Sequence, residues 1–473
     1  MKKTGIVCTI GPGSLSEDML ARLRAAGMTM ARLNGSHADL DWHRRAIALI
    51  RKVLPEVPIL LDIPGRKIRT TLLAHEPVFE IGEVIVLTTE TGHDGSAKVP
   101  VNYPDLHGDL QPGHTILADD GTLRFTVVEV RGRDIHARAE TAGQLKSRKG
   151  INVPFVKLNT PQVTPRDHQM IGFAKETGVD FIGLSFVESA AHVRAIREII
   201  ADSSPLIVAK VENQGGMDNV DEIVAATDAI MVDRGDLSVE TSLFDVALRQ
   251  KRIINAARSH GRPVIVATEM LHTMITNPFP TKAEVSDITN AVLDGCAATM
   301  LSGETAVGAF PEEAVRTMRE VADAAELYVQ ERLDGEAMPL GETVPEVVSQ
   351  TIPMMCRALP ITKIVAITRS GFAARMIASH RPRQPILAVS DDANAARSFN
   401  LIAGTIGIFS EKRFPRDSAD HVLMVLELLW RRGLIVAGDQ VLIVGLSYPT
   451  KNTRMNSIQI HSVADLVTTF GWH

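Results

Sequence analysis

Short runs of apolar, often β-branched residues alternate with amphipathic stretches along much of the chain, and each run ends in polar residues. This alternation is typical of βα units and predicts a parallel sheet. Eight strands are predicted, at Gly5–Ile10, Met28–Asn34, Ile59–Ile63, Phe181–Phe186, Leu206–Val211, Ile230–Arg234, Val264–Met270 and Thr299–Gly303. Eight repeats favour a closed (β/α)₈ barrel, although a doubly wound open sheet has the same alternation.

Helix ends between these strands have recognisable signals. A polar N-cap at Ser16 and a terminating Gly27 bound one helix. Thr164-Pro165 opens another, with proline at the first helical position. A third is expected over Thr281–Asp294 because Gly295 follows it.

One interval interrupts the alternation. Between Ile63 and Thr164 no helical repeat is visible, and turn dipeptides separate β-type runs instead. These runs are Val84–Thr88, His114–Leu117, Leu123–Val130 and Ile135–Ala139. We therefore predict a small all-β lid domain over residues 68–157, inserted after the third barrel strand, where it would overhang the barrel mouth.

A second α/β domain is predicted at the C-terminal end. The barrel would comprise residues 1–67 and 158–335, a charged Gly/Pro-containing linker Glu331–Gly341 would follow, and the new domain would occupy 336–473. Its expected strands are Ile364–Thr368, Ile386–Val389, Thr405–Phe409, Val441–Gly445 and Ile458–His461, and its expected helices are Val347–Leu359, Phe372–His380 and Ser418–Arg432.

Composition narrows the class of protein. The 473 residues are 45% hydrophobic and 22% charged, which is ordinary for a folded globular protein. The net charge of −6 and the 4% aromatic content argue against nucleic-acid binding. The separated Cys8, Cys296 and Cys356 indicate neither a zinc site nor a disulfide framework, and no apolar run has the length of a membrane span. We expect a cytoplasmic protein.

Candidate chemistry lies where the barrel strands end, because catalytic groups of this fold come from those ends. The polar residues there are Arg32, Asn34, Ser36, Asp62, Arg69, Lys210, Glu212, Asp233, Asp236, Thr268, Glu269, Ser302 and Glu304. Any one of them alone is more often solvated or in a structural ion pair. Together, Glu212 and Asp236 suit Mg²⁺ or Mn²⁺. Arg32, Arg69 and Lys210 suit a phosphorylated substrate.

Seven segments resemble the pyruvate kinase family, in that family's order. They are Cys8–Pro12, Arg32–His37, Lys210–Asn213, Arg234–Leu237, Ala267–Leu271, Pro280–Glu284 and Met300–Ala306. The resemblance covers nearly the whole chain, including the insertion and the C-terminal domain. It implies phosphoryl transfer from phosphoenolpyruvate to ADP, and a homotetramer.

The resemblance implies a role for each matching residue. Glu212 and Asp236 would hold the divalent metal, and Lys210 would stabilise the transferring phosphoryl group and the enolate oxygen. Arg32 would contact phosphoryl oxygens, with Arg69 also at the substrate. Backbone N–H groups of Arg234, Gly235 and Asp236 would hold the substrate carboxylate, and Thr268 would help a proton reach the enolate carbon.

Further implied sites surround this centre. Asn34, Ser36 and Asp62 match the family's ligands for a monovalent cation. Lys149, Pro12 and His37 would lie at the nucleotide. Thr368, Arg369, Ser370 and Gly371 resemble the effector-phosphate loop.

The chain departs from the family pattern at several of these places. Lys67 stands where K⁺-requiring members have glutamate, and Pro64 where they have lysine. The closest resemblance is therefore to K⁺-independent members, and we expect that K⁺ is not required. On this interpretation the Lys67 ammonium enters the space near Asn34, Ser36 and Asp62; the alternative is a solvated loop lysine.

Other departures concern the substrate and the effector. Asp233 replaces a small residue and brings a carboxylate close to the expected substrate carboxylate, which is unfavourable unless it is paired or points away. Glu269 and His272 replace glutamine and glutamate. Phe372 and Ala373 follow the effector-type loop where effector-binding members have polar residues, so little activation by fructose 1,6-bisphosphate is expected.

Three functions fit these observations. The first is pyruvate kinase. The second is a relative acting on another enolate or phosphoenol acid, or a metal-dependent lyase or decarboxylase without a nucleotide; the lid and Lys149 argue against the latter. The third is a weak regulatory binding protein, against which the joint presence of Lys210, Glu212, Asp236 and Thr268 argues.

Overall fold

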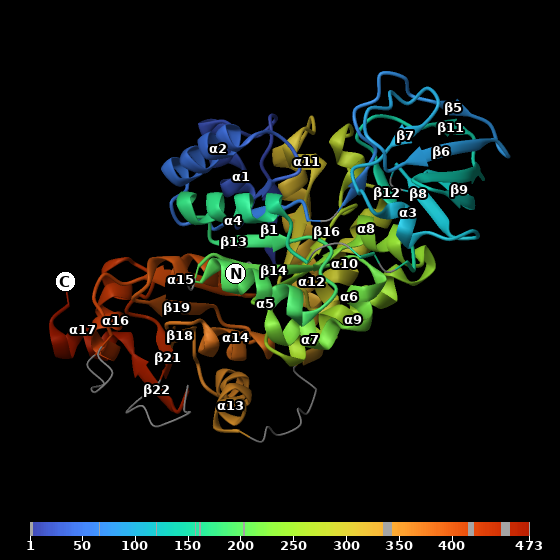
Figure 1. Ribbon diagram of the computed structural model, residues 1–473. Coiled ribbons are helices and arrows are strands. Elements are labelled where there is room, and N and C mark those ends of the chain that lie inside the picture. Colours follow the sequence, from blue (N-terminus) through green and yellow to red (C-terminus); the bar gives the residue numbers. More distant parts are fainter. Residues whose placement is uncertain are drawn as a thin grey trace.

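The computed structural model describes residues 3–65, 67–119, 121–156, 158–159, 162–201, 204–333, 343–414, 421–445 and 455–472. They form a central barrel, an inserted β unit and a C-terminal α/β unit (Figure 1). None of the helices within these ranges is long and apolar enough to cross a membrane.

The central sheet is a closed barrel of parallel strands in the order β1-β17-β16-β15-β14-β13-β3-β2. The strands are β1 Gly5–Thr9, β2 Met30–Asn34, β3 Ile59–Ile63, β13 Phe181–Leu184, β14 Leu206–Val211, β15 Ala229–Asp233, β16 Val264–Ala267 and β17 Ala298–Leu301. The predicted (β/α)₈ barrel is confirmed and the open sheet is excluded. Strand β16 ends before the predicted Met270 because Thr268 and Glu269 have positive φ angles of 67° and 54°, which no strand accommodates.

Helices surround the barrel, and one apolar cluster fills the space between them and the strands, while a second fills the barrel interior. The helices are α1 Glu17–Ala26, α2 Leu40–Val53, α4 Pro165–Thr177, α5 Ala190–Ile200, α6 Gln214–Asp218, α7 Val220–Ala226, α8 Arg234–Glu240, α9 Val246–Ser259, α10 Lys282–Asp294, α11 Gly303–Ala306 and α12 Pro311–Leu333. The predicted caps at Ser16, Gly27 and Gly295 are present, and Thr164 and Thr281 each form a capping box.

The insertion after β3 is the predicted all-β unit. Its main sheet has the order β4-β12-β8-β9-β10-β6-β7, and β5 pairs with β11. The strands are β4 Ile68–Arg69, β5 Val78–Phe79, β6 Val84–Thr88, β7 Val99–Pro100, β8 Thr115–Ala118, β9 Leu123–Arg131, β10 Asp134–Ala139, β11 Gly143–Gln144 and β12 Gly150–Asn152. The short helix α3 Leu106–Asp109 was not expected.

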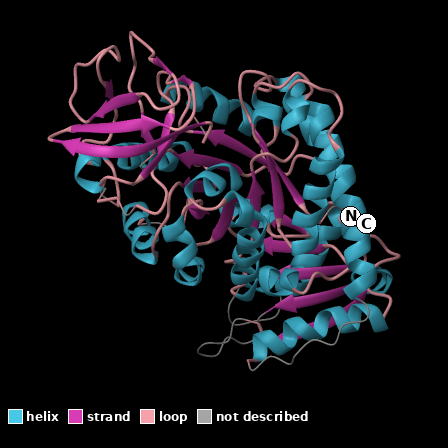
Figure 2. Ribbon diagram, turned by 90° about the vertical axis from the view of Figure 1, so that its right-hand side faces the viewer, coloured by secondary structure: helices cyan, strands magenta, loops and turns pink. Residues whose placement is uncertain are grey.

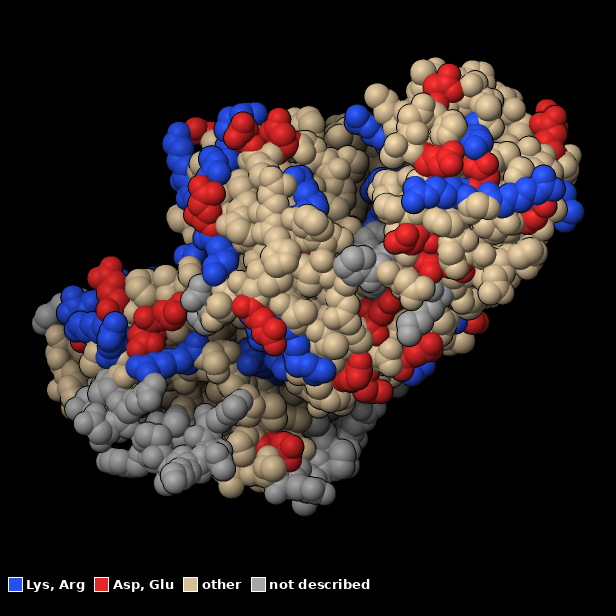
Figure 3. Space-filling model, in the orientation of Figure 1, with Lys and Arg blue, Asp and Glu red and all other residues tan. Residues whose placement is uncertain are grey.

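The insertion has its own apolar core and lies beside the barrel mouth. Asn152 of β12 donates a hydrogen bond of 2.5 Å to Glu240 of α8, the helix that follows barrel strand β15. The surface is hollowed between the insertion and the barrel (Figure 3). The insertion therefore has the position of a lid over the strand ends.

The C-terminal unit is a five-stranded sheet of order β20-β19-β18-β21-β22, in which only β22 is antiparallel. Its strands are β18 Lys363–Ile367, β19 Ile386–Ser390, β20 Thr405–Phe409, β21 Gln440–Gly445 and β22 Ser457–Ser462. Its helices are α13 Val344–Ala358, α14 Phe372–Ser379, α15 Ala393–Ser398, α16 His421–Arg431 and α17 Val463–Phe470. Two apolar clusters form its core, and helices cover the sheet (Figure 2).

Part of the linker prediction was wrong. Helix α12 continues to Leu333, so Glu331–Leu333 are helical, because the helical pattern of this stretch outweighs its charge. The rest of the predicted linker lies outside the described residues, as does Ser418 at the start of the helix that was predicted over Ser418–Arg432.

Candidate active site

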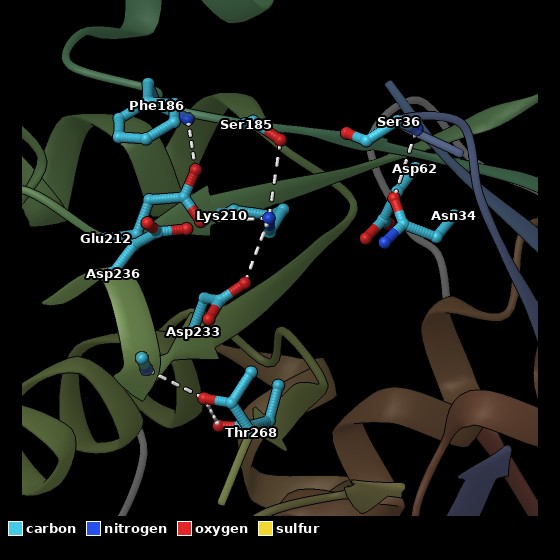
Figure 4. A network of polar contacts seen from close by, with 12 residues as sticks. Asn34, Ser36, Asp62, Ser185, Phe186, Lys210, Glu212, Asp233, Asp236 and Thr268 are labelled. Carbon is cyan, nitrogen blue, oxygen red and sulfur yellow. Dashed lines mark hydrogen bonds and ion pairs between the residues drawn. The ribbon is translucent and has the colours of Figure 1, made fainter. Parts of the chain in front are cut away.

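Charged side chains from neighbouring strands converge at the C-terminal end of the barrel (Figure 4). Lys210 belongs to β14 and Glu212 follows it directly, Asp233 ends β15, and Asp236 lies in the first turn of α8. Parallel strands bring these ends together, although the residues are up to 26 positions apart in the chain.

Lys210 lies between two carboxylates. Its Nζ is 2.9 Å from Glu212 Oε2 and 3.0 Å from Asp233 Oδ2, and it donates a hydrogen bond of 3.3 Å to Ser185 Oγ. Burial alone lowers the pKa of this amine, but Asp233 and Glu212 outweigh burial and raise the pKa well above its ordinary value. Lys210 is therefore a buried, charged ammonium at the mouth.

Three carboxylates form one cluster. Ligand atoms of Glu212, Asp233 and Asp236 all lie within 4.8 Å of one another. Glu212 is fully buried; its Oε1 accepts a 2.6 Å hydrogen bond from the Phe186 N–H, and the described partner of its Oε2 is the Lys210 ammonium at 2.9 Å. Burial raises the pKa of Glu212 to about 8, against the opposing effect of Lys210. Converging carboxylates at this spacing fit a hard divalent cation, which is bound by oxygen ligands.

Lys67 belongs to this cluster. Its Nζ is 2.6 Å from Asp236 Oδ1, and only 18% of its side chain is exposed. The solvated-loop alternative is therefore wrong. The expectation that the ammonium enters the space near Asn34, Ser36 and Asp62 was also wrong for this structure, because the carboxylate of Asp236 attracts it instead.

The three residues expected at a monovalent cation lie beside this cluster (Figure 4). Asn34 Oδ1 accepts a 3.1 Å hydrogen bond from the Ser36 N–H. Arg32 donates to Asp62 Oδ2 from both Nε (2.9 Å) and Nη2 (2.6 Å), while Asp62 Oδ1 is buried without a described hydrogen bond. Glycine is required at position 183, which pairs with Asp62 on the neighbouring strand, because a Cβ there would lie 2.1 Å from Asp62 Oδ1. The structure thus pairs Arg32 with Asp62.

Thr268 has an uncommon backbone conformation. Its φ of 67° is a genuine outlier for a β-branched residue, and such strain concentrates at functional sites. Thr268 Oγ1 accepts a 2.8 Å hydrogen bond from the Gly235 N–H, one of the groups predicted to hold the substrate carboxylate. The Arg234 guanidinium instead bonds Asp287 (2.6 Å) and the Thr268 carbonyl (2.7 Å), so this side chain supports the loop.

The residues expected at the nucleotide lie on separate segments and do not form one cluster with the carboxylates. Lys149 forms a 2.6 Å ion pair with Asp119 of the insertion. The pKa of His37 is lowered by burial and by the nearby Arg69 and Arg32, which places these groups in one electropositive region. Pro12 is exposed in the loop after β1.

The effector-type loop Thr368–Gly371 connects β18 to α14. Arg369 bonds Asp391 through Nε (3.1 Å) and Nη2 (2.8 Å), and Nη2 also bonds the Phe414 carbonyl (2.9 Å). Gly371 has a φ of 72°, which favours glycine at this turn. The arginine of this loop is already neutralised within the domain.

Two functional neighbours were missed from the sequence. Ser185 bonds Lys210, and Phe186, with a φ of 53°, directs its N–H at Glu212. Both follow β13, so their position at a strand end was the available signal. Asp233 had been expected to be unfavourable unless paired, and it is paired with Lys210.

A closed barrel with a buried lysine, three converging carboxylates and arginines beside a lid fits a metal-assisted phosphotransferase. Comparison with known families is more specific. Residues 1–315 match the model of the pyruvate kinase barrel domain, and residues 346–461 match that of the pyruvate kinase alpha/beta domain. The chain belongs to the pyruvate kinase family.

Individual relatives agree with this assignment. The chain is 38% identical to a pyruvate kinase of Geobacillus stearothermophilus, over 98% of this chain and 81% of the relative. It is 36% identical to a pyruvate kinase of Clostridium perfringens, over 96% of this chain and 98% of the relative.

Proposed function

We infer that the cluster at the barrel mouth is the active site of a pyruvate kinase. The enzyme transfers the phosphoryl group of phosphoenolpyruvate to ADP and forms pyruvate and ATP. The observation that carries this assignment is the buried Lys210 ammonium, held between Glu212 and Asp233 at the strand ends. A buried cation beside a divalent-cation site is suited to charge that develops during phosphoryl transfer.

The metal site of the proposal consists of Glu212 and Asp236. A bound Mg²⁺ or Mn²⁺ supplies Lewis acidity for phosphoryl and enolate oxygens. The fit rests on hard carboxylate oxygens that lie within 4.8 Å of one another.

Lys210 neutralises the transferring phosphoryl group and then the enolate oxygen, because Ser185, Glu212 and Asp233 hold its ammonium at the strand ends and a substrate oxygen can replace one of these partners. Thr268 orients the proton that reaches the enolate carbon, directly or through water. The Gly235 N–H exchanges its bond to Thr268 for the substrate carboxylate.

Arginines provide the anion contacts. Arg32, aligned by its two bonds to Asp62, contacts phosphoryl oxygens, and Arg69 completes the substrate pocket from the insertion. Lys149, Pro12 and His37 contact the nucleotide when the insertion closes over the mouth.

Activity independent of K⁺ is part of the proposal. Lys67 places a fixed positive charge 2.6 Å from Asp236, within the same cluster of charges. A free K⁺ would face repulsion from this ammonium, of about 1 kcal/mol at 4 Å in a water-like medium. Asn34, Ser36 and Asp62 then stabilise the positive region as polar neighbours and not as ligands of an essential ion.

The broader organisation follows the family. The proposed domains are the barrel (1–67 and 158–335), the lid (68–157) and the C-terminal domain (336–473), in a cytoplasmic homotetramer. The loop Thr368–Gly371 is proposed to bind anions at most weakly, because Arg369 is bonded to Asp391 and to the Phe414 carbonyl.

A coupled assay tests the function directly. Purified protein with phosphoenolpyruvate, ADP and Mg²⁺ should form pyruvate and ATP in equal amounts. Pyruvate without ATP would indicate a nucleotide-free lyase or phosphatase, and neither product would indicate a different phosphoenol acid or a binding protein.

A further inference from the structure

Asp233 is a carboxylate that the proposed reaction does not use. It ends β15, directly before Arg234 and Gly235, and it is 5% exposed. Burying a charge is costly unless partners compensate it. Its described ion pair is with Lys210, at 3.0 Å, and Lys210 is already shared with Glu212.

The cluster holds more carboxyl groups than ammonium groups. Glu212, Asp233 and Asp236 contribute three carboxyl groups, and Lys210 and Lys67 are the two ammonium groups in described ion pairs with them. The Lys210 ammonium is therefore the counter-ion of two carboxyl groups, those of Glu212 and Asp233. A cation entering this cluster would gain attraction from all three.

The carboxylates themselves indicate where such a cation would lie. Glu212 Oε1 accepts a hydrogen bond from the Phe186 N–H, whereas the described partner of the buried Oε2 is the Lys210 ammonium, at 2.9 Å, which Asp233 shares. Glu212 Oε2 and Asp233 Oδ2 both approach Lys210 Nζ, so the two carboxylates converge. All three carboxylates have a ligand atom within 4.8 Å of the others, a spacing from which small side-chain movements reach one ion.

The second oxygen of Asp233 faces the expected substrate position. A Cβ built on Gly235 would lie 3.7 Å from Asp233 Oδ1 and 3.5 Å from Thr268 Oγ1, so Asp233 borders the backbone proposed for the substrate carboxylate. Two carboxylates in one place repel each other unless a cation lies between them.

We propose that Asp233 is a third carboxylate ligand of the divalent-cation site, so that this chain binds the cation before substrate arrives. The inference rests on the metal site proposed at Glu212 and Asp236. An ion held by only two carboxylates depends on substrate oxygens to complete its coordination, whereas a third carboxylate reduces that dependence.

Direct Mn²⁺ binding without phosphoenolpyruvate tests this inference. Free Mn²⁺ is measured by electron paramagnetic resonance for the parent, Asp233→Ala and Asp233→Asn. We expect Kd to rise at least roughly tenfold in both variants, as metal-site substitutions typically cause. Unchanged Kd values would overturn the proposal. Thermal unfolding checks that each variant is folded, and the asparagine variant retains the side-chain volume.

Glu240→Gln is the matched control. This carboxylate lies one helix turn beyond Asp236 and bonds Asn152, but it is not a member of the three-carboxylate cluster. We expect its removal to change the Mn²⁺ Kd much less than removal of Asp233. An equal effect of both would show that only net charge matters, and would overturn the ligand role.

The number of water molecules on the bound Mn²⁺ separates ligation from charge. Pulsed electron–nuclear double resonance in ¹⁷O-labelled water should show an additional coordinated water in Asp233→Ala relative to the parent. Weaker binding with an unchanged number of waters would mean that Asp233 acts only as the counter-ion of Lys210, and would overturn the proposal.

Glu212→Gln distinguishes this inference from the metal site on which it rests. If this variant loses Mn²⁺ binding while both Asp233 variants retain it, the proposed function stands and the role of Asp233 fails. If Glu212→Gln also binds Mn²⁺ normally, the metal site itself is elsewhere, and both proposals about it fail.

Discussion

The barrel mouth and the loop Thr368–Gly371 are built alike but differ in how their charges are used. Each follows the end of a parallel strand and leads into a helix, α8 in the barrel and α14 in the C-terminal domain. At the mouth, two buried carboxylates, Glu212 and Asp233, share the one ammonium of Lys210. In the loop, Arg369 is bonded twice to Asp391 and once to a carbonyl.

The difference shows that a sequence motif can match a family without leaving its charged groups free to bind a ligand. At the mouth, Glu212 and Asp233 share the single ammonium of Lys210, so a bound cation can supply further positive charge. In the loop a neighbouring strand end already supplies the counter-ion. Four predictions test this contrast, from the largest expected effect to the smallest.

Removing the central cation of the mouth should have the largest effect. Lys210→Met should lower kcat by at least roughly a hundredfold, as loss of one electrostatic stabiliser does. Steady-state assays measure this, and circular dichroism checks the fold. Lys251→Met is the control, since Lys251 is an exposed lysine paired with Asp294 on the outer helices, and it should retain normal turnover. Near-normal turnover of Lys210→Met would refute the assigned role.

Reversing the charge of Lys67 should change the ionic requirement. The parent should be active in tetramethylammonium buffer without K⁺, whereas Lys67→Glu should gain a K⁺ requirement of about tenfold, equivalent to about 1.4 kcal/mol. Rates are compared with and without KCl at matched ionic strength, because salt screens charges generally.

Lys67→Met separates loss of the ammonium from gain of a carboxylate, and we expect it to lose activity without being restored by K⁺. Tenfold stimulation of the parent by K⁺ alone would show that Lys67 does not substitute for the ion.

The effector-type loop should respond weakly to phosphate esters. Fructose 1,6-bisphosphate should shift the apparent KM for phosphoenolpyruvate by less than the roughly fivefold that marks ordinary allosteric coupling. Asp391→Asn releases the Arg369 guanidinium and should increase any response. A large drop in the apparent KM of the parent would show that the loop Thr368–Gly371 binds the effector, and that its charges are as available to a ligand as those of the barrel mouth.

Asp391→Asn should also have a small, pH-dependent effect on the free energy of unfolding. Burial raises the pKa of Asp391, but Arg369 and the Phe414 N–H outweigh burial and lower it. A depressed folded-state pKa stabilises the fold above the unfolded value of 3.8, and this contribution is lost as pH falls through the folded-state pKa.

Asp391→Asn should therefore reduce the free energy of unfolding at neutral pH by about 1 kcal/mol at most, because Arg369 is 42% exposed and solvent screens the pair. Urea unfolding of the parent and the variant at pH 7 and near pH 2 measures the difference. A difference that does not shrink at low pH would contradict the ion-pair explanation.

The architecture was predictable because it depends on local patterns. Alternating apolar runs and helix caps such as Ser16 and Thr164 predicted the strands and helices of the barrel, since strand and helix periodicity and capping act over a few residues. The end of β16 was misplaced because the positive φ angles of Thr268 and Glu269 are imposed by their surroundings and not by residue type.

The sequence alone determined the resemblance to the family, the alternation of strands and helices with its β insertion, and the residue types at the strand ends, while the structure decided for the closed barrel. Only the tertiary structure decided how these charges pair: Lys67 with Asp236, Lys210 with Asp233 and Glu212, and Arg369 with Asp391. The reason is physical. Helix and strand propensities are properties of neighbouring residues, whereas ion pairs depend on distances and burial between segments that the fold alone brings together.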